Sequence, residues 1–135
     1  IVLWRLSDMG YRSQVVLAIS KHLTPFLHLA TSKSSDAEEL VFKDHDTFDR
    51  DYGGDKSWLL VWDNIKWYNE SYDGIKAIQG FVDAAASDEY EFEIDGEAQS
   101  SSEHIRFVRI GEETDDNEVQ GFGFWDIGIE RSISY

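Results

Sequence analysis

Carboxylates alternate with apolar side chains in the segment Glu89–Asp95, and their spacing is the most specific chemical pattern in the sequence. A period of two places the apolar side chains on one face of an extended chain and the acids on the other. The acids of this segment are Glu89, Glu91, Glu93 and Asp95. They would lie about 6.6 Å apart, which is twice the rise of a strand residue. Successive phosphates of one nucleic-acid strand have a similar spacing, roughly 6 to 7 Å. The pattern predicts a half-buried strand whose wet face carries a row of negative charges.

Two further groups of acids lie in segments that we expect to be loops. The first group surrounds the turn signal Gly53-Gly54 and consists of Asp44, Asp46, Asp49, Asp51 and Asp55. The second consists of Glu112, Glu113, Asp115, Asp116 and Glu118. With the acidic strand, these loops are predicted to form one continuous negative surface on a rigid sheet. Its carboxylates would take the place of phosphates against the Lys and Arg side chains of a protein that binds DNA or RNA.

The same carboxylates are also suitable ligands for a hard metal ion. The run from Asp49 through Asp51 to Gly53 echoes a calcium-binding loop, but Leu60 stands where the twelfth position requires a glutamate. A metal-dependent enzyme that uses the Asp44–Asp55 carboxylates is therefore an alternative. The preferred interpretation includes no metal and no cofactor.

Signatures of other catalytic chemistry are missing from the sequence. The chain has no cysteine, no Gly-x-Ser-x-Gly elbow and no glycine-rich phosphate loop, and no motif joins its four histidines to a serine or aspartate. Carboxylate pairs for glycoside hydrolysis could be drawn from 27 acids, but abundance of this kind is not diagnostic. We therefore predict a protein that is not an enzyme.

The charge balance indicates the kind of partner. The chain has 135 residues, which fits one domain with its own core, and its formal net charge is −15. Such a field repels nucleic acids and acidic membranes and attracts basic protein surfaces. Local pairs with Lys66, Lys76, Arg106 and Arg109 could neutralise some of the acids, although exposed pairs of this kind contribute little. Those few bases cannot cancel the acids. No apolar run reaches the roughly 20 residues of a membrane span, so we expect a cytoplasmic protein; the oligomeric state is not indicated.

The elements of the amino-terminal part are predicted from periodicity and breakers. Ile1–Leu6 is expected to form a short strand. Ser7 or Asp8 would then cap a helix over Met9–Leu23, which Pro25 would end. The β-branched residues of that segment leave a strand as the alternative. Phe26–Ala30 is predicted to be a short buried strand.

The middle of the chain gives clearer patterns. A helix is expected to begin at Ala37, capped by Ser35 or Asp36, and to lead into the first acidic loop. Ser57–Tyr68 is apolar on both faces over its first residues, which predicts a central strand. Gly74–Ala86 carries an amphipathic stripe and is predicted to be a helix capped by Asp73.

The carboxyl-terminal part is predicted to be mostly strand. The acidic strand Glu89–Asp95 is expected to pair with His104–Ile110 across the polar turn Gly96–Glu103, which would bring Arg106 near its acids. Phe122–Tyr135 is predicted to form one or two terminal strands.

These elements predict a single α+β domain: a mainly antiparallel sheet of about four or five strands with two or three helices packed on it. In size and acidity the chain resembles two kinds of small inhibitor, the nucleic-acid-mimicking proteins of viruses and the immunity proteins that neutralise toxic nucleases. This resemblance is one of composition and transfers no residues. It implies an inhibitory binding protein that blocks a DNA- or RNA-acting protein, such as a restriction or CRISPR-type nuclease; a toxin-neutralising immunity protein is the alternative.

Overall fold

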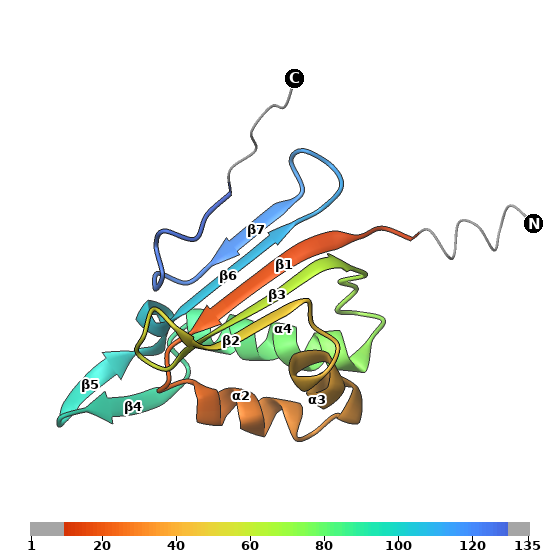
Figure 1. Ribbon diagram of the computed structural model, residues 1–135. Helices are drawn as coiled ribbons and strands as arrows, with labels where there is room; N and C mark the ends of the chain where they lie inside the picture. The colour runs from red at the N-terminus through yellow and green to blue at the C-terminus, as the bar shows by residue number, and fades with distance from the viewer. Residues whose placement is uncertain (1–9, 130–135) are drawn as a thin grey trace, which may run out of the picture.

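The computed structural model describes residues 10–129, which form an antiparallel sheet with helices on one face (Figure 1). The elements in chain order are β1 (Ser13–Ile19), α2 (Thr24–Thr31), α3 (Ser35–Phe42), β2 (Thr47–Tyr52), β3 (Ser57–Ile65), α4 (Asp73–Ala86), β4 (Glu91–Ile94), β5 (Glu97–Ser100), the 3₁₀ turn η1 (Ser101–His104), β6 (Ile105–Ile110) and β7 (Asn117–Gln120). The five-stranded sheet has the order β2-β3-β1-β6-β7, and β4 and β5 form a separate two-stranded sheet. The predicted α+β class is confirmed.

The core lies between the sheet and the helices α2, α3 and α4 (Figure 1). Strand β1 is in the middle of the sheet, where Leu17 is paired with Leu60 of β3 on one side and with Phe107 of β6 on the other. All three side chains are fully buried. A buried central strand of this kind gives the molecule a stiff platform, because each of its residues is held by two neighbouring strands.

The segment predicted to be a helix over Met9–Leu23 contains the strand β1, so the strand alternative is correct for Ser13–Ile19. Val15, Leu17 and Ile19 are buried at a period of two, which satisfies the sheet and leaves the β-branched side chains unstrained. Pro25 does not end a helix. It stands in the first turn of α2, where its missing N–H costs nothing.

Two predictions in the segments that flank α3 are corrected. Phe26–Ala30, expected to be a strand, is part of the helix α2. The first acidic loop contains the edge strand β2, which pairs with β3. The α3 helix itself is present, but its cap is Ser34, whose hydroxyl accepts a hydrogen bond from the Ala37 N–H at 3.3 Å.

Helix α4 and strand β3 agree with the sequence prediction. Strand β3 is an interior strand, with β2 on its outer side, and its Trp62 is 2% exposed. Helix α4 begins one residue early, so Tyr72, not Asp73, is its N-cap residue. Gly74 lies where α4 meets α3, and a larger side chain there would require α3 to shift: a Cβ would be 3.0 Å from the Ala37 nitrogen.

The predicted pairing of the acidic strand is wrong. Strand β4 pairs with β5, which lies inside the segment expected to be a turn, and β6 pairs with β1 and β7. Asp95 and Gly96 make the connection with φ angles of +52° and +81°. Two consecutive residues of positive φ form the type I′ turn that closes a two-residue hairpin, and an Asp-Gly pair favours it.

The carboxyl-terminal prediction is also corrected. Strand β7 begins inside the second acidic loop, and the described residues 121–129 form no further strand. Arg106 does not approach the acidic strand: its guanidinium donates hydrogen bonds to the carbonyl oxygens of Gly121 (2.9 Å), Trp125 (3.3 Å) and Ile127 (2.9 Å). The strand expected over Ile1–Leu6, the caps Ser7 and Asp8, and the end of the terminal segment, residues 130–135, lie outside the described residues.

Candidate binding surface

The β4–β5 hairpin is held on the helices by aromatic rings. The Phe92 ring stacks on His22 with the ring centroids 5.8 Å apart. Tyr90, at the foot of the hairpin, stacks on Phe26 (4.6 Å) and on Phe81 (5.6 Å). These contacts fix the apolar face of β4 and therefore the direction of the opposite face.

The base of the hairpin is fixed by polar contacts. Asp88 has a φ of +59°, and its carboxylate accepts a hydrogen bond from the Ser102 N–H at 2.9 Å. This backbone hydrogen bond, with a further one from the Ser102 side chain, holds the pKa of Asp88 below its usual range. The Ser101 hydroxyl donates to the Ala85 carbonyl oxygen at 2.7 Å. The hairpin is thus tied to the end of α4 on both sides of its base.

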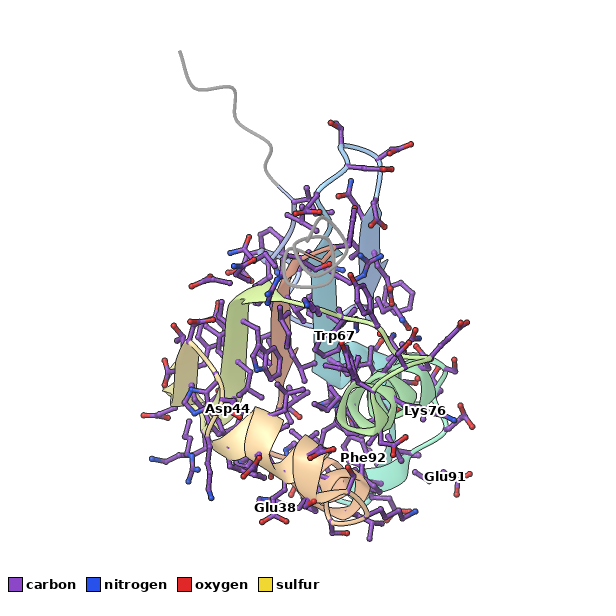
Figure 2. All side chains as sticks on the ribbon, turned by 90° about the vertical axis from the view of Figure 1, so that its right-hand side faces the viewer. Glu38, Asp44, Trp67, Lys76, Glu91 and Phe92 are labelled. Carbon is purple, nitrogen blue, oxygen red and sulfur yellow. The ribbon has the colours of Figure 1, made fainter. Side chains whose placement is uncertain are left out.

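Three exposed glutamates, which we call the acid row, lie along this segment: Glu91 and Glu93 on the outer face of β4, and Glu89 two residues before the strand. The residues opposite the last two on β5 are Ser100 and Ala98, whose side chains are too short to cover a carboxylate. No Lys or Arg occurs between Asp88 and His104. Within residues 10–129 no ion pair involves the acid row. Figure 2 shows Glu91 pointing outward from the hairpin, with Phe92 directed to the helices.

The first acidic group is partly used inside the β2–β3 hairpin. The Asp46 carboxylate accepts a hydrogen bond from the Asp63 N–H at 2.7 Å, and Asp51 accepts one from the Lys56 N–H at 2.9 Å. The Asp49 side chain accepts from the Asp51 N–H at 2.9 Å. Hydrogen bonds from Ser57, chiefly from its side chain, lower the pKa of Asp55. These acids are exposed, but several of them also stabilise the turn that they surround.

The second acidic group is divided. Asp116 accepts hydrogen bonds from Arg109 at 2.8 Å and from the Tyr11 hydroxyl at 2.6 Å, and Glu118 lies 3.6 Å from the same guanidinium. The hydrogen bond with Asp116 raises the pKa of Arg109. Glu118 also accepts from the buried Gln79 at 3.0 Å. Asp116 and Glu118 are therefore part of a polar network between sheet and α4. The remaining members are exposed: Glu112, Glu113 and Asp115.

The three acidic groups do not form one continuous surface. Pairing of Ile19 with Ile105 and of Gln14 with Ile110 places the start and the end of β6 at opposite ends of β1. The β4–β5 hairpin precedes β6, and the second acidic group follows it, so these two groups lie at opposite ends of the sheet (Figure 1). The first group lies along β2, which is the edge strand farthest from β7. Asp51 and Asp55, at the β2–β3 turn, are at the same end as the hairpin.

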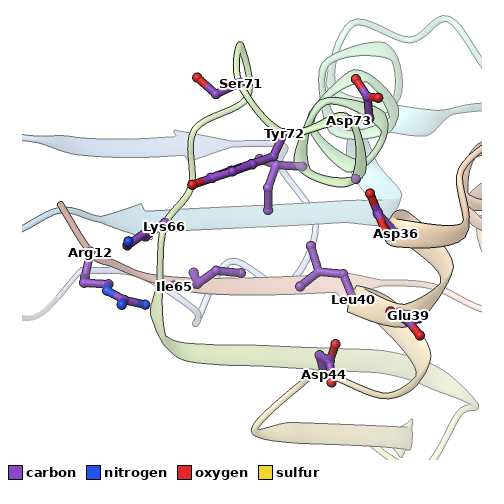
Figure 3. Close-up of a pocket in the computed structure, with 12 residues that line it drawn as sticks. Arg12, Asp36, Glu39, Leu40, Asp44, Ile65, Lys66, Ser71, Tyr72 and Asp73 are labelled. Atoms are coloured by element: carbon purple, nitrogen blue, oxygen red, sulfur yellow. The ribbon is translucent and has the colours of Figure 1, made fainter. Parts of the chain in front are cut away.

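The structure adds a cleft that sequence reasoning did not identify. A cavity of about 600 Å³ lies between α3, the start of α4 and the end of β3. The acids that line it are Asp36, Glu39, Asp44 and Asp73, and the bases are Arg12 and Lys66. Figure 3 shows the acids on the side of the helices, the two bases at the other end, and Leu40 and Ile65 between them. Only Asp44 was a predicted site residue; Asp36 and Glu39 are on α3 and Asp73 is on α4, two helices that only the tertiary structure brings together.

No protein-family model, curated protein or solved structure matches this chain. The surface is therefore interpreted from its own chemistry.

Two properties of residues 10–129 bear on the chemistry of this surface. No three His, Asp or Glu side chains in this range converge in a way that could hold a metal ion. The helices of the same range are too short or too polar to cross a bilayer. What the described geometry offers is a rigid, exposed row of carboxylates, to which cationic groups of another molecule could bind.

Proposed function

We propose that this protein is an inhibitory binding protein whose acid row docks on the basic surface of a DNA- or RNA-acting protein, such as a restriction or CRISPR-type nuclease. The observation that supports the proposal is the acid row itself: three exposed carboxylates on or just before one anchored hairpin, with short side chains opposite Glu91 and Glu93 and no base between Asp88 and His104.

The spacing of the acid row suits such a partner. Alternate strand residues are about 6.6 Å apart, so the Glu91 and Glu93 carboxylates on β4 would meet Lys and Arg side chains that otherwise bind consecutive phosphates. The aromatic contacts of Phe92 and Tyr90 hold the strand in place before binding. Preorganisation of this kind reduces the ordering cost of association. The net charge of −15 would further attract a basic surface and raise the association rate at low salt.

The other acidic groups are weaker candidates. Asp116 and Glu118 are paired with Arg109, and Asp46 and Asp51 accept backbone hydrogen bonds within their own hairpin. A carboxylate that already has a partner gains less from a new cation, because the existing contact must be given up or shared. We therefore assign the primary contact to the acid row and a supporting, longer-range role to the remaining acids.

The experiment compares a hairpin variant with a control of equal charge. In the hairpin variant the acid row is replaced by glutamine: Glu89→Gln, Glu91→Gln and Glu93→Gln. In the control three exposed acids at the opposite end of the sheet are replaced: Glu70→Gln, Glu112→Gln and Asp115→Asn. Each purified protein is titrated into cleavage assays with restriction and CRISPR-type nucleases, and affinity for any nuclease that is inhibited is measured over a salt series.

We expect the wild-type protein and the control to inhibit, and the hairpin variant to bind at least about 100-fold more weakly at low salt, since contacts between close charge pairs are worth about 1.5–7 kcal/mol each. Affinity should fall as salt rises, and less steeply for the hairpin variant. Equal affinity of the two variants, affinity independent of salt, or no inhibition of any nuclease would contradict the proposal.

A further inference from the structure

A serine and a histidine are hydrogen-bonded where β1 ends. The Ser20 hydroxyl lies 2.9 Å from Nδ1 of His104, and the Ser20 N–H donates to the His104 carbonyl oxygen at 2.9 Å. The His22 N–H donates to the Ser20 oxygen at 3.3 Å. The two residues are 84 positions apart in the chain, so no sequence motif could reveal the pair. The backbone and side-chain contacts together fix the serine oxygen against the imidazole.

The other imidazole nitrogen has a partner that sets the tautomer. Nε2 of His104 lies 3.3 Å from the side-chain oxygen of Gln99 on β5. Because this oxygen is an acceptor, Nε2 carries the proton and Nδ1 is left to accept the Ser20 hydroxyl proton. Phe92 and His22 pack edge-on against the ring, with centroids 4.9 and 5.8 Å away. Burial lowers the pKa of His104, and nearby His22 lowers it further, so the ring is neutral at physiological pH.

The pair opens on a cavity of about 450 Å³. Ser20 and His104 both line it, together with Lys21, Phe124 and four other residues: His22, Asp55, Ser57 and Glu103. Besides the carboxylates of Asp55 and Glu103, the cavity thus contains a hydroxyl next to a neutral base, a cation and an apolar ring. These are the groups that acyl transfer requires: a nucleophile, its general base, a positive charge for the oxyanion, and a contact for an acyl group.

We infer that Ser20 is a nucleophile activated by His104, and that this cavity hydrolyses small carboxylic esters. The Ser20 oxygen attacks the ester carbonyl carbon while its proton passes to Nδ1 of His104, and the carbonyl electron pair moves to the oxygen, where the Lys21 ammonium stabilises the charge. The tetrahedral intermediate re-forms the carbonyl and expels the alcohol, which takes the proton from Nδ1. Water, deprotonated by the same nitrogen, then attacks the acyl-serine, and the acid is released with Ser20 restored.

This activity is independent of the acid row. The row lies on the outer face of the hairpin, and none of its glutamates lines this cavity. Gln99 and His104 join the hairpin to the end of β1, but neither is altered by the glutamine substitutions of the binding experiment. Failure of one proposal therefore leaves the other unaffected.

The experiment measures ester cleavage and covalent labelling. Hydrolysis of p-nitrophenyl acetate is followed for the wild-type chain, Ser20→Ala and His104→Gln. The controls are an exposed serine and an exposed histidine elsewhere, Ser32→Ala and His28→Gln. In parallel, the wild-type chain is treated with an alkyl fluorophosphonate, and the modified residue is located by peptide mass spectrometry.

We expect Ser20→Ala and His104→Gln to reduce hydrolysis by about 100-fold or more, the lower end of the effect of a positioned base, while both controls retain the wild-type rate. The phosphonate should label Ser20. The rate should persist below about pH 6.5, the value at which an ordinary histidine is half protonated. Wild-type hydrolysis no faster than that of Ser20→Ala, or labelling at other residues only, would overturn the inference. Should Ser20→Ala fail to give a native circular dichroism spectrum, the labelled position in the wild-type chain decides.

Discussion

At the scale of the residue, whether a carboxylate of this chain is bound inside the fold or exposed to solvent depends on the side chains that strand pairing brings next to it. Asp116 faces Arg109 and Tyr11 and is held by both. Glu91 faces Ser100 across the hairpin, and within residues 10–129 no ion pair involves it. In the sequence both acids stand in strongly acidic segments, and nothing there distinguishes their roles. Their different roles follow from the partner that strand pairing brings to each.

His104 makes stability depend on pH. Because its pKa is lowered in the folded chain, chiefly by burial, the unfolded chain binds a proton more readily, near its ordinary value of about 6.5. The contribution of His104 to stability is therefore present above about pH 6.5 and is lost as the pH falls. We expect the urea midpoint of the wild-type chain to decrease from pH 7.5 to about pH 5.5.

The matched variants separate His104 from the other histidines. His104→Gln should flatten this pH dependence, whereas His28→Gln, which changes an exposed ring stacked on Phe42, should leave it as in the wild-type chain. A midpoint that falls equally in both variants would mean that other groups cause the effect. Asp55 and Asp88 also have lowered pKa values, but carboxylates of this kind lose their contribution at lower pH, below about 4.

At the scale of the element, helix α4 joins the two halves of the fold, and its glycines have opposite environments. A Cβ on Gly74 would lie 3.0 Å from backbone atoms of both Asp36 and Ala37 on α3, whereas a Cβ on Gly80 would meet nothing within 4 Å. The first glycine permits close approach of two helices. At Gly80 no contact requires a glycine.

This difference predicts opposite effects of the same substitution. Gly74→Ala should lower the free energy of unfolding by about 1–3 kcal/mol, because the α3 backbone must move. Gly80→Ala should raise it by about 0.5–1 kcal/mol, because alanine loses less conformational freedom in a helix. Urea denaturation of both variants measures the two values. Equal changes of the same sign would show that α3 adapts without cost, contrary to the contact geometry.

At the scale of the whole molecule, the acids repel one another. The net charge is −15, and the ion pairs within residues 10–129 include those of Arg109 with Asp116 and Glu118 and that of Lys56 with Asp51. Self-repulsion of this size opposes the compact state. It is reduced by salt, since the Debye length falls to about 3 Å at 1 M.

We therefore expect salt to stabilise the protein. The Tm should rise by several degrees between 0.01 M and about 1 M NaCl, because about 1 kcal/mol corresponds to roughly 4 °C for a domain of this size. The variant with glutamine at the three positions of the acid row should show a higher Tm at low salt and a smaller rise. An identical rise in the variant and the wild-type chain would assign the salt effect to general ion effects instead of to these charges.

The sequence alone determined the fold class, the helix α4, the interior strand β3 and the exposure of the acid row. Each of these predictions depends on a local periodicity. The apolar stripe of α4 and the alternation from Glu89 to Ile94 indicate which side chains face inward, whichever element packs against them. Segment Ser13–Ile19 fits either period, and only its pairing with β3 and β6 made it a strand.

Only the tertiary structure decided which distant residues meet. Strand pairing separated the acidic groups to different ends and edges of the sheet, gave Asp116 its arginine, and placed Ser20 against His104. A linear pattern records the faces of each element, but contacts between elements depend on sheet order and register, which are set by the packing energy of the whole core. The chemical character of each segment can therefore be predicted from the sequence, but the way in which segments combine into surfaces and cavities cannot.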